Sequence, residues 1–393
     1  ANRPLPPDAP GVRPIKMTHL LVALSAHGFG HAAQTAPVVN ALRQRFPDLR
    51  LTLRTRLPRA FLASRFDGEF EWVPQESDFG MVMDTALDVN VAQSAAAYVR
   101  LHREWDHQVR QEAKALERLA PDFVLANVPY LTLAGAAMAA IPACAMCSLN
   151  WADIHQHFFP GIQGSDSIQT QMLDAYRRAG VFLQLEPGMP MANLPNRHTI
   201  GPVARLGANR RAEIDEKLGL PRDTRLVLIT SGGIDLHLPV ASWPRASNIH
   251  WLVPAAWQVS CPGTSAMETL GMAFTDILRS CDAVIGKPGY GLFTEAACND
   301  IPLLYVHRPD WPEEPYLVSW LRQHGRCFEI DRPALEQGEI TASLEKLWHL
   351  PPKPPVIPLG IDQAVALLVE QWPGLSVRQP GHGRHSAVSL RDE

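Results

Sequence analysis

The sequence lacks a strong net charge and lacks a recognisable metal-binding motif. Its 393 residues carry a formal net charge of −4 at pH 7, which argues against a general binder of nucleic acids or other polyanions. The fifteen histidines form no HExxH pattern, and no Asp-x-Asp pair follows an expected strand. We therefore predict no nucleic-acid partner, no metal site and no cofactor.

Cysteine is scarce, and the six cysteines lie at scattered positions. Cys144 and Cys147 form a CxxC pattern, but they lie in the apolar run ACAMCSL, which is typical of a buried strand. Buried thiols are the favoured interpretation of this pair, and a zinc or redox site is the alternative. Such cysteine usage is typical of a reducing compartment and predicts a cytoplasmic protein.

Long uninterrupted hydrophobic segments are also lacking. Residues 131–149 carry no charge, but Gly135 and Pro142 interrupt them and many of the rest are small alanines. A strand, a helix and a second strand fit this segment better than a membrane span, so we predict no integral membrane segment. Residues 1–16 are rich in proline and lack the apolar core of a signal peptide, which predicts a disordered leader.

Short apolar strands alternate with helices along the chain, and 46% of its residues are hydrophobic. This order predicts an α/β protein with parallel sheets, and the length suits two domains. The segments Asn90–Leu119 and Ala334–Leu347 are each predicted as one helix, and Ser77–Val89 is predicted as a loop. The expected divisions are an N-terminal domain over 17–201, a C-terminal domain over 202–359, a helix over 360–373 that packs back on the first domain, and a frayed tail over 374–393.

One stretch, DAVIGKPGYGLFTEAACNDIP, organises the rest of the chain. The apolar strand Asp282–Ile285 runs into a glycine-rich turn that contains Gly289 and Gly291, and a helix follows. Free N–H groups and the helix dipole at such a turn favour an anion, and Lys287 adds a positive charge. Glu295 lies about one helical turn beyond Gly291, where it can accept hydrogen bonds from sugar hydroxyls. The stretch predicts a phosphate-binding site next to a sugar.

Three motifs carry a resemblance to a known family: SAHGFGHAAQ, GKPGYG…TEA and RPDWPEEPYL. The chain resembles GT-B glycosyltransferases, and in particular the glycosyltransferase-like N-terminal half of plant arabinokinases and the UDP-sugar transferases. The resemblance implies two Rossmann-like, doubly wound domains that face a cleft, with a nucleotide sugar on the second domain. Lys287 and Glu295 are eight residues apart, which matches the family's diphosphate-binding and ribose-binding positions.

By this resemblance, the glycine turns and the motif after the next strand bind the donor. The expected donor-binding residues are Gly28, Gly30, Ser231, Gly232, Gly233, Lys287, Gly289, Tyr290, Gly291, Thr294, Glu295, Glu313 and Glu314. Simpler interpretations stay open for several of them. Lys287 would otherwise be a surface lysine, the turn at 231–233 a plain tight turn, and Glu313 and Glu314 a solvent-facing acidic pair ahead of a helix.

His31 follows the first glycine turn and is the expected catalytic base. A neutral histidine at the carboxyl edge of a sheet suits removal of a proton from an acceptor hydroxyl. By resemblance, His31 matches the catalytic histidine of the plant UDP-sugar transferases, and a role in ordering the loop is the alternative. His27 is a candidate substrate contact.

The carboxylate that supports this histidine in the plant enzymes is replaced here by Asn127, which cannot stabilise an imidazolium by charge. Asp84, Asp88 and Asp153 are candidates for a substitute, and Asp153 is included with His31 as catalytic. Each of these aspartates would otherwise be a solvated or capping residue. Together with His27, the residues Asp84, Asn127 and Trp151 are expected on the acceptor side.

The sequence therefore predicts a metal-independent, inverting glycosyltransferase that moves a sugar from a nucleotide diphosphate donor, with UDP as the expected nucleotide, to an unidentified acceptor. Two alternatives stay open. The first is a nucleotide-sugar epimerase or hydrolase on the same fold, and the second is a regulatory protein that binds a nucleotide sugar without catalysis. The sugar, the acceptor and the oligomeric state are left open.

Overall fold

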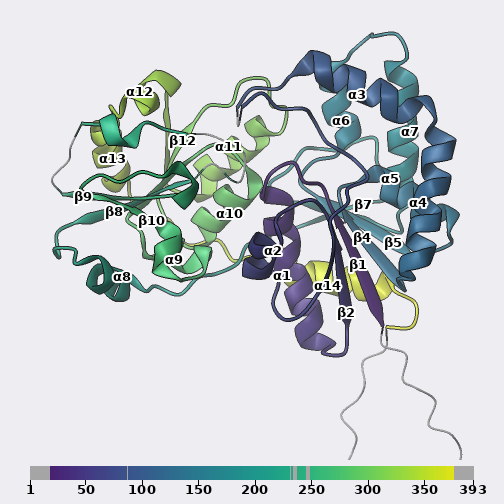
Figure 1. Cartoon of the computed structure of the whole chain (residues 1–393), viewed down its shortest axis with the longest axis horizontal. Helices are drawn as coiled ribbons and strands as arrows, with labels where there is room; N and C mark the ends of the chain where they lie inside the picture. Colours follow the sequence, from purple (N-terminus) through teal and green to yellow (C-terminus); the bar gives the residue numbers. More distant parts are fainter. Residues whose placement is uncertain (1–17, 86, 231, 233–236, 245–247, 376–393) are drawn as a thin grey trace, which may run out of the picture.

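The computed structural model describes residues 18–85, 87–230, 232, 237–244 and 248–375. The expected leader, most of the expected tail, and two predicted donor residues, Ser231 and Gly233, lie outside these residues. The described residues form two α/β domains that lie side by side, one in purple to blue and the other in green (Figure 1).

The first domain contains a parallel sheet that, within the described residues, has seven strands in the order β3-β2-β1-β4-β5-β6-β7. The strands are β1 (His19–Leu24), β2 (Arg50–Arg54), β3 (Glu71–Val73), β4 (Phe123–Asn127), β5 (Ala143–Cys147), β6 (Phe182–Leu185) and β7 (Arg197–Ile200). The helices are α1 (Gly30–Arg45), α2 (Arg59–Arg65), α3 (Val91–Arg103), α4 (Trp105–Leu119), α5 (Tyr130–Met138), α6 (Trp151–Phe158) and α7 (Ser165–Arg177). The strand order reverses beside β1, and ligands of doubly wound sheets bind at such a point.

The second domain contains a parallel sheet with the order β10-β9-β8-β11-β12-β13 among the described strands. The strands are β8 (Arg225–Thr230), β9 (Ile249–Val253), β10 (Thr264–Ala266), β11 (Ala283–Gly286), β12 (Leu303–Val306) and β13 (Cys327–Ile330). The helices are α8 (Arg211–Leu218), α9 (Phe274–Ser280), α10 (Tyr290–Cys298), α11 (Glu314–His324), α12 (Arg332–Gln337) and α13 (Thr341–Trp348), followed by α14 (Gly360–Gln371). Every pairing in both sheets is parallel, so the predicted pair of doubly wound α/β domains is confirmed.

Two predicted helices are each divided in the structure. The segment expected as one helix over 90–119 breaks at Glu104, whose φ of −120° and ψ of 43° are not helical. Just before the break, the buried His102 ring bonds to Gln171 and to the Tyr130 hydroxyl, so tertiary contacts turn the chain there. The helix expected over 334–347 is interrupted at Gly338, whose φ of +72° ends α12.

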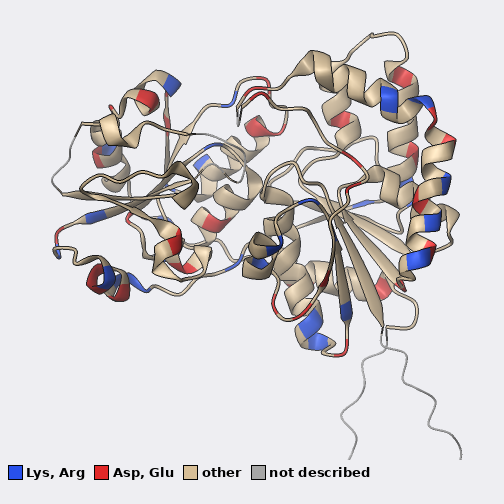
Figure 2. Cartoon of the chain, viewed as in Figure 1, with Lys and Arg blue, Asp and Glu red and all other residues tan. Residues whose placement is uncertain are grey.

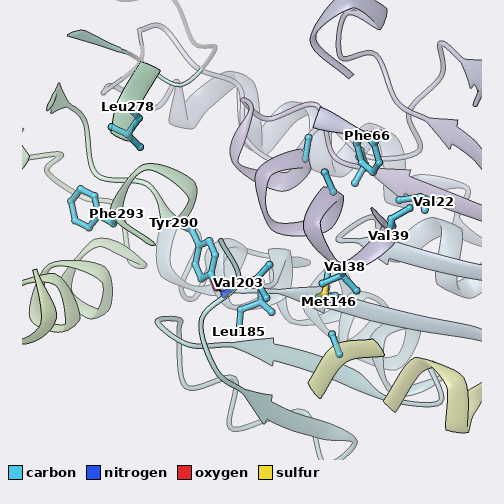
Figure 3. Close-up of a cluster of buried hydrophobic side chains, with 14 of the residues drawn as sticks. Val22, Val38, Val39, Phe66, Met146, Leu185, Val203, Leu278, Tyr290 and Phe293 are labelled. Atoms are coloured by element: carbon cyan, nitrogen blue, oxygen red, sulfur yellow. Dashed lines mark hydrogen bonds between the residues drawn. The ribbon is translucent and has the colours of Figure 1, made fainter. Parts of the chain in front are cut away.

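Helix α14 lies against the first domain, although it follows the second domain in the sequence (Figure 1). The Gly360 N–H donates to the Pro202 carbonyl at 3.0 Å, and the Trp372 ring stacks on Phe123 at 4.6 Å. Buried apolar side chains continue from one domain into the other through Val203 and Tyr290 (Figure 3). One hydrophobic core therefore extends through both domains.

Charged residues of both signs are interspersed along the outer helices of the two domains (Figure 2). This pattern is consistent with the small net charge of the chain. Within the part of the chain that the structure describes, no helix is both long and apolar enough to cross a membrane. All six cysteines are unpaired.

Candidate nucleotide-sugar site

The two glycine turns of the sequence meet at the boundary between the domains. The first turn connects β1 to α1, and the second follows β8. The Phe29 N–H of the first donates to the Gly232 carbonyl of the second at 2.9 Å. Gly28 and Gly232 have φ values of +85° and +68°, a left-handed region that favours glycine, so both turns depend on these residues.

A pocket of about 530 Å³ opens beside this contact, and both domains line it. Its N-terminal-domain wall is largely apolar and includes Phe29 and Phe61, whose rings stack at 3.7 Å. The opposite wall is built from the segment before and along α9 and from the start of α10. The lining residues of the second domain are Thr230, Gly232, Met267, Glu268, Met272, Phe274, Ile277, Lys287, Gly289, Gly291, Leu292 and Glu295.

Lys287 and the N-terminus of α10 form the polar end of the pocket. The first N–H groups of α10 have no partner inside the helix, as at any helix start, and they follow the extended N-cap residue Gly289. A side chain at Gly289 would meet no atom within 4 Å, so the backbone faces open space. Burial and the nearby Arg308 guanidinium lower the pKa of Lys287 to about 7. No ion-pair partner of Lys287 occurs among the described residues. This end of the pocket can accept an anion.

Glu295, the expected ribose ligand, forms an ion pair with Arg65 from helix α2 of the first domain. Arg65 Nη1 lies 2.5 Å from Glu295 Oε1, and both side chains are buried. The Arg65 guanidinium also lies over the Phe274 ring at 5.0 Å, and its Nε has no hydrogen-bond partner. Arg65 lines the pocket and was not predicted from the sequence.

Gly30 and Gly291 also line the pocket and bring α1 and α10 together. A side chain at Gly291 would approach Ala33 Cβ to 2.8 Å, so this position needs glycine for the close contact between domains. The side chains of Tyr290 and Thr294 point elsewhere. The Tyr290 hydroxyl accepts from Val203 N–H at 2.9 Å, and Thr294 donates to the Tyr290 carbonyl at 2.8 Å. These two side chains therefore do not face the pocket.

His31 lies in the first turn of α1, beside the pocket, and contacts Asn127 at the end of β4. Its Nδ1 lies 2.8 Å from Asn127 Oδ1, which makes Nδ1 the protonated nitrogen because an amide oxygen only accepts. Asn127 donates in turn to Gln34 and Thr35, each at 2.9 Å. Burial lowers the pKa of His31 to about 4, so the ring is neutral at pH 7 with Nε2 as its acceptor.

Within the described residues, none of the three candidate aspartates contacts His31. Asp84 accepts from Asn90 Nδ2 at 2.8 Å, and Asp88 contacts Arg332 across the domain boundary at 3.2 Å. Asp153 accepts from Asn150 in the first turn of α6. The residue that orients His31 is Asn127.

A second cluster joins the two domains, where His27 contacts two tryptophans. The His27 ring stacks on Trp311 with centroids 5.4 Å apart and meets Trp151 edge-on at 5.3 Å. Its Nε2 is buried and has no hydrogen-bond partner among the described residues. The Arg308 guanidinium lies 3.8 Å over the Trp311 ring. Arg308 and Trp311 belong to the RPDWPEEPYL motif, but they were not singled out from the sequence.

Glu313 and Glu314 are both buried, unlike a solvent-facing acidic pair. Glu313 accepts from the Ser148 hydroxyl of the first domain at 2.6 Å and from Trp311 Nε1 at 3.2 Å. Glu314 accepts from His307 Nδ1 at 2.5 Å and from the Arg308 backbone N–H at 2.8 Å. These two hydrogen bonds order the turn before α11. In the part of the chain that the structure describes, Glu313 bonds to the other domain, whereas the hydrogen bonds of Glu314 stay within its own domain.

Asp78 is a further buried carboxylate that the sequence did not single out. It accepts from the Ser25 hydroxyl at 2.9 Å, and Trp151 Nε1 donates to the same hydroxyl at 3.2 Å. Burial raises the pKa of Asp78 to about 7. This network fixes the Trp151 ring against His27. Among the described residues, no three His, Cys, Asp or Glu side chains are grouped closely enough to hold a metal ion.

Comparisons with known proteins agree with this architecture. No protein-family model matches the chain. Over 351 residues it is 26% identical to the L-arabinokinase of Arabidopsis thaliana, and the match covers 85% of this chain and 32% of that protein. The chain thus spans about a third of the length of this curated relative.

Solved glycosyltransferase structures are similar over almost the whole chain. CalG4, the calicheamicin glycosyltransferase, has a TM-score of 0.56 at 18% identity, covering 91% of this chain and 95% of its own. The glycosyltransferase of kitacinnamycin has a TM-score of 0.59 at 15% identity, with coverages of 91% and 100%. Arabidopsis thaliana UGT89C1, complexed with UDP, has a TM-score of 0.52 at 14% identity, with coverages of 92% and 96%. The predicted GT-B fold and the predicted resemblance are confirmed.

Proposed function

We propose that this chain is a metal-independent, inverting glycosyltransferase whose donor is a nucleotide diphosphate sugar, with UDP as the expected nucleotide. One observation carries the proposal. Lys287 and the free N–H groups of α10 face an interdomain pocket whose remaining walls are largely apolar. A nucleotide diphosphate fits such a pocket, because its diphosphate would meet the cationic end and its planar base the apolar walls. The similarity to structures such as UGT89C1 with UDP supports it.

The donor would lie with its diphosphate on Lys287 and the start of α10. The nucleoside would occupy the apolar part of the pocket between Met267, Phe274 and Phe61. Glu295 would accept hydrogen bonds from the ribose hydroxyls. Its carboxylate would then either bind the ribose and Arg65 together or lose its ion pair with Arg65. Both domains would thus contact the nucleotide.

His31 would act as the base in the transfer step. Its neutral Nε2 takes the proton of the acceptor hydroxyl as that oxygen forms a bond to the anomeric carbon. The bond from this carbon to the diphosphate breaks with its electron pair on the leaving oxygen, and attack from the opposite face inverts the carbon. Lys287 and the helix dipole stabilise the charge that develops on the diphosphate, so no metal ion is required.

A second candidate is a protein that binds a nucleotide sugar without transferring it. His31 is 5% exposed and does not line the pocket, and its partner Asn127 is uncharged. An imidazolium formed during catalysis would therefore lack a charged partner. Such a binding protein would have the same donor site as the proposed glycosyltransferase, but it would not transfer the sugar.

A thermal-shift screen followed by a turnover assay tests the proposal. A nucleotide sugar that binds only the folded protein raises the melting midpoint. We expect a rise with UDP-glucose or a related UDP-sugar, and sugar transfer by NMR that survives EDTA. Conversion to a new nucleotide sugar without acceptor would instead indicate an epimerase, and binding without turnover would favour the second candidate. No shift with any nucleotide sugar would contradict the proposal.

A further inference from the structure

Arg308 is a buried cation without a paired anion among the described residues. Its side chain is 4% exposed, and its Nε has no hydrogen-bond partner. Its Nη2 donates to the Met83 sulfur at 3.8 Å, and a thioether is a weak acceptor. Guanidinium groups at such depth are normally paired, because an unpaired buried charge is costly. Arg308 therefore has unused binding capacity.

The carboxylates of Glu313, Glu314 and Asp88 are near enough to raise the pKa of Arg308 by their charge, but among the described residues none forms an ion pair with its guanidinium. The guanidinium carbon lies 3.8 Å from the centre of the Trp311 ring, a contact that covers a face of the guanidinium and uses none of its N–H donors. The buried carboxylate in the same turn, Glu313, is already bonded to Ser148 and Trp311 and makes no ion pair with Arg308. Glu314 accepts from the backbone N–H of Arg308 and from His307, not from the guanidinium.

Arg308 lies where the two domains meet, because its guanidinium covers the Trp311 ring and that ring stacks on His27 of the first domain. Arg308 does not line the pocket itself, but its positive charge contributes to lowering the pKa of Lys287 at the polar end of the pocket. Met83 and His27 come from the first domain, whereas Arg308 and Trp311 come from the second. A separation of the domains would expose the guanidinium beside the diphosphate.

We propose that Arg308 binds an anionic oxygen group, a carboxylate or a phosphate, on the substrate that reaches the site next to the nucleotide diphosphate. The inference rests on the proposed function, because that function places the diphosphate on Lys287 and leaves Arg308 free. The anionic group belongs either to the transferred sugar or to the acceptor. A planar guanidinium held on an aromatic face suits two parallel hydrogen bonds to such a group.

Titration calorimetry with matched donors tests the inference. UDP-glucuronate and UDP-glucose differ at one carbon, where the first carries a carboxylate. If the anion is on the sugar, the wild type binds UDP-glucuronate about 10- to 100-fold more tightly, the range of a charge-assisted hydrogen bond. Arg308→Met removes this preference and leaves UDP affinity unchanged. Arg322→Met is the control, because Arg322 is an exposed arginine on α11.

A second arm distinguishes the two sources of the anion. Inorganic phosphate is titrated into the UDP-saturated protein, and binding that Arg308→Met abolishes assigns the group to the acceptor side. Arg308→Lys keeps the positive charge but loses the planar guanidinium with its paired N–H donors. We expect this variant to retain only part of the preference for UDP-glucuronate, or only part of the phosphate binding. Arg308→Met should also unfold at the same or a higher temperature than the wild type, because it removes an unpaired buried charge.

Three results would overturn the inference. The first is that neither the acidic sugar nor phosphate shows binding that depends on Arg308. The second is that Arg308→Met weakens bare UDP as strongly as Lys287→Met does, which would make Arg308 a ligand of the diphosphate. The third is a loss of stability in both Arg308 variants with no change in anion binding. If UDP fails to bind, the proposed function fails; phosphate is then titrated into the protein without UDP, and binding that Arg308→Met abolishes would still identify Arg308 as an anion-binding residue.

Discussion

Replacing Asn127 with aspartate changes the charge beside His31 and leaves the shape of the side chain nearly constant. In the wild type, His31 Nδ1 meets the neutral Asn127 oxygen at 2.8 Å, and burial lowers the pKa of the ring to about 4. In Asn127→Asp, a carboxylate takes the place of that oxygen. An opposite charge at this distance favours the imidazolium and raises the pKa of His31.

The size of the shift follows from the distance between the two charges. Each charge is spread over its group, so a contact of 2.8 Å between the nearest atoms leaves the centres of charge about 4 Å apart. Two unit charges at about 4 Å attract by about 4 kcal/mol at an effective dielectric constant of about 20. One pKa unit corresponds to about 1.4 kcal/mol, so the shift is about three units. The pKa of His31 should therefore rise from about 4 to about 7. The ring would then titrate in the neutral range instead of staying neutral throughout it.

The same substitution removes two hydrogen bonds. The Asn127 amide donates to Gln34 Oε1 and to Thr35 Oγ1, and a carboxylate cannot donate to either. An acceptor left unsatisfied in a buried site costs about 1 to 3 kcal/mol. Because two acceptors lose their donor, we expect Asn127→Asp to lower the free energy of unfolding at pH 8 by about 2 to 6 kcal/mol. Urea denaturation measures this loss.

Nitrogen-15 NMR of labelled histidine measures the pKa of His31 directly, with the His31→Gln spectrum identifying its signals. This assay needs no substrate. Asp153→Asn is the matched control, because Asp153 bonds to Asn150 and should leave the His31 titration unchanged. An unchanged pKa in Asn127→Asp, or an equal shift in Asp153→Asn, would refute the assigned contact.

Three further predictions concern the donor site and the base. Affinity for UDP-glucose should be constant below pH 7 and fall about tenfold per pH unit above it. The reason is that Lys287, whose pKa is about 7, must be protonated to bind the diphosphate. Calorimetry between pH 6 and 9 measures this dependence, and an affinity independent of pH would show that Lys287 does not contact the diphosphate. Arg65→Met should lower the free energy of unfolding by about 3 to 5 kcal/mol, because it strands the buried Glu295 carboxylate. The double variant Arg65→Met, Glu295→Gln should recover most of this loss in urea denaturation. If the losses of the two single variants simply add in the double variant, the ion pair does not contribute as proposed. His31→Ala should keep donor affinity and lose about 10²- to 10⁴-fold in turnover, with His31→Gln no better. Recovery by glutamine in a steady-state assay would mean that His31 only orders the loop.

Local signals in the sequence predicted much of the fold. Strand, glycine turn and helix follow one another within a few residues at both turns, and each part has its own periodicity. The sequence also identified Lys287 and the start of α10, because the charge, the glycines and the helix are adjacent. The break at Glu104 had no such signal, since neither glycine nor proline marks it and the contacts of His102 produce it.

The contacts between domains could not be predicted in the same way. Arg65 and Glu295 are 230 residues apart, and nothing near Arg65 indicates a partner. His27 and Trp311 meet only after both sheets have formed. The replacement of an aspartate by Asn127 was visible in the sequence, but its use as the partner of His31 required the structure.

Calorimetric titration of UDP and of uridine into the wild type and Lys287→Met measures whether Lys287 binds the diphosphate. The two ligands differ only in the diphosphate, whose proposed position is on Lys287 and the N-terminus of α10. We predict that Lys287→Met weakens UDP binding by about 1.5 to 3 kcal/mol, the range of a charge-assisted hydrogen bond, and leaves uridine binding unchanged. An equal loss for both ligands, or no difference between the two proteins, would contradict the account.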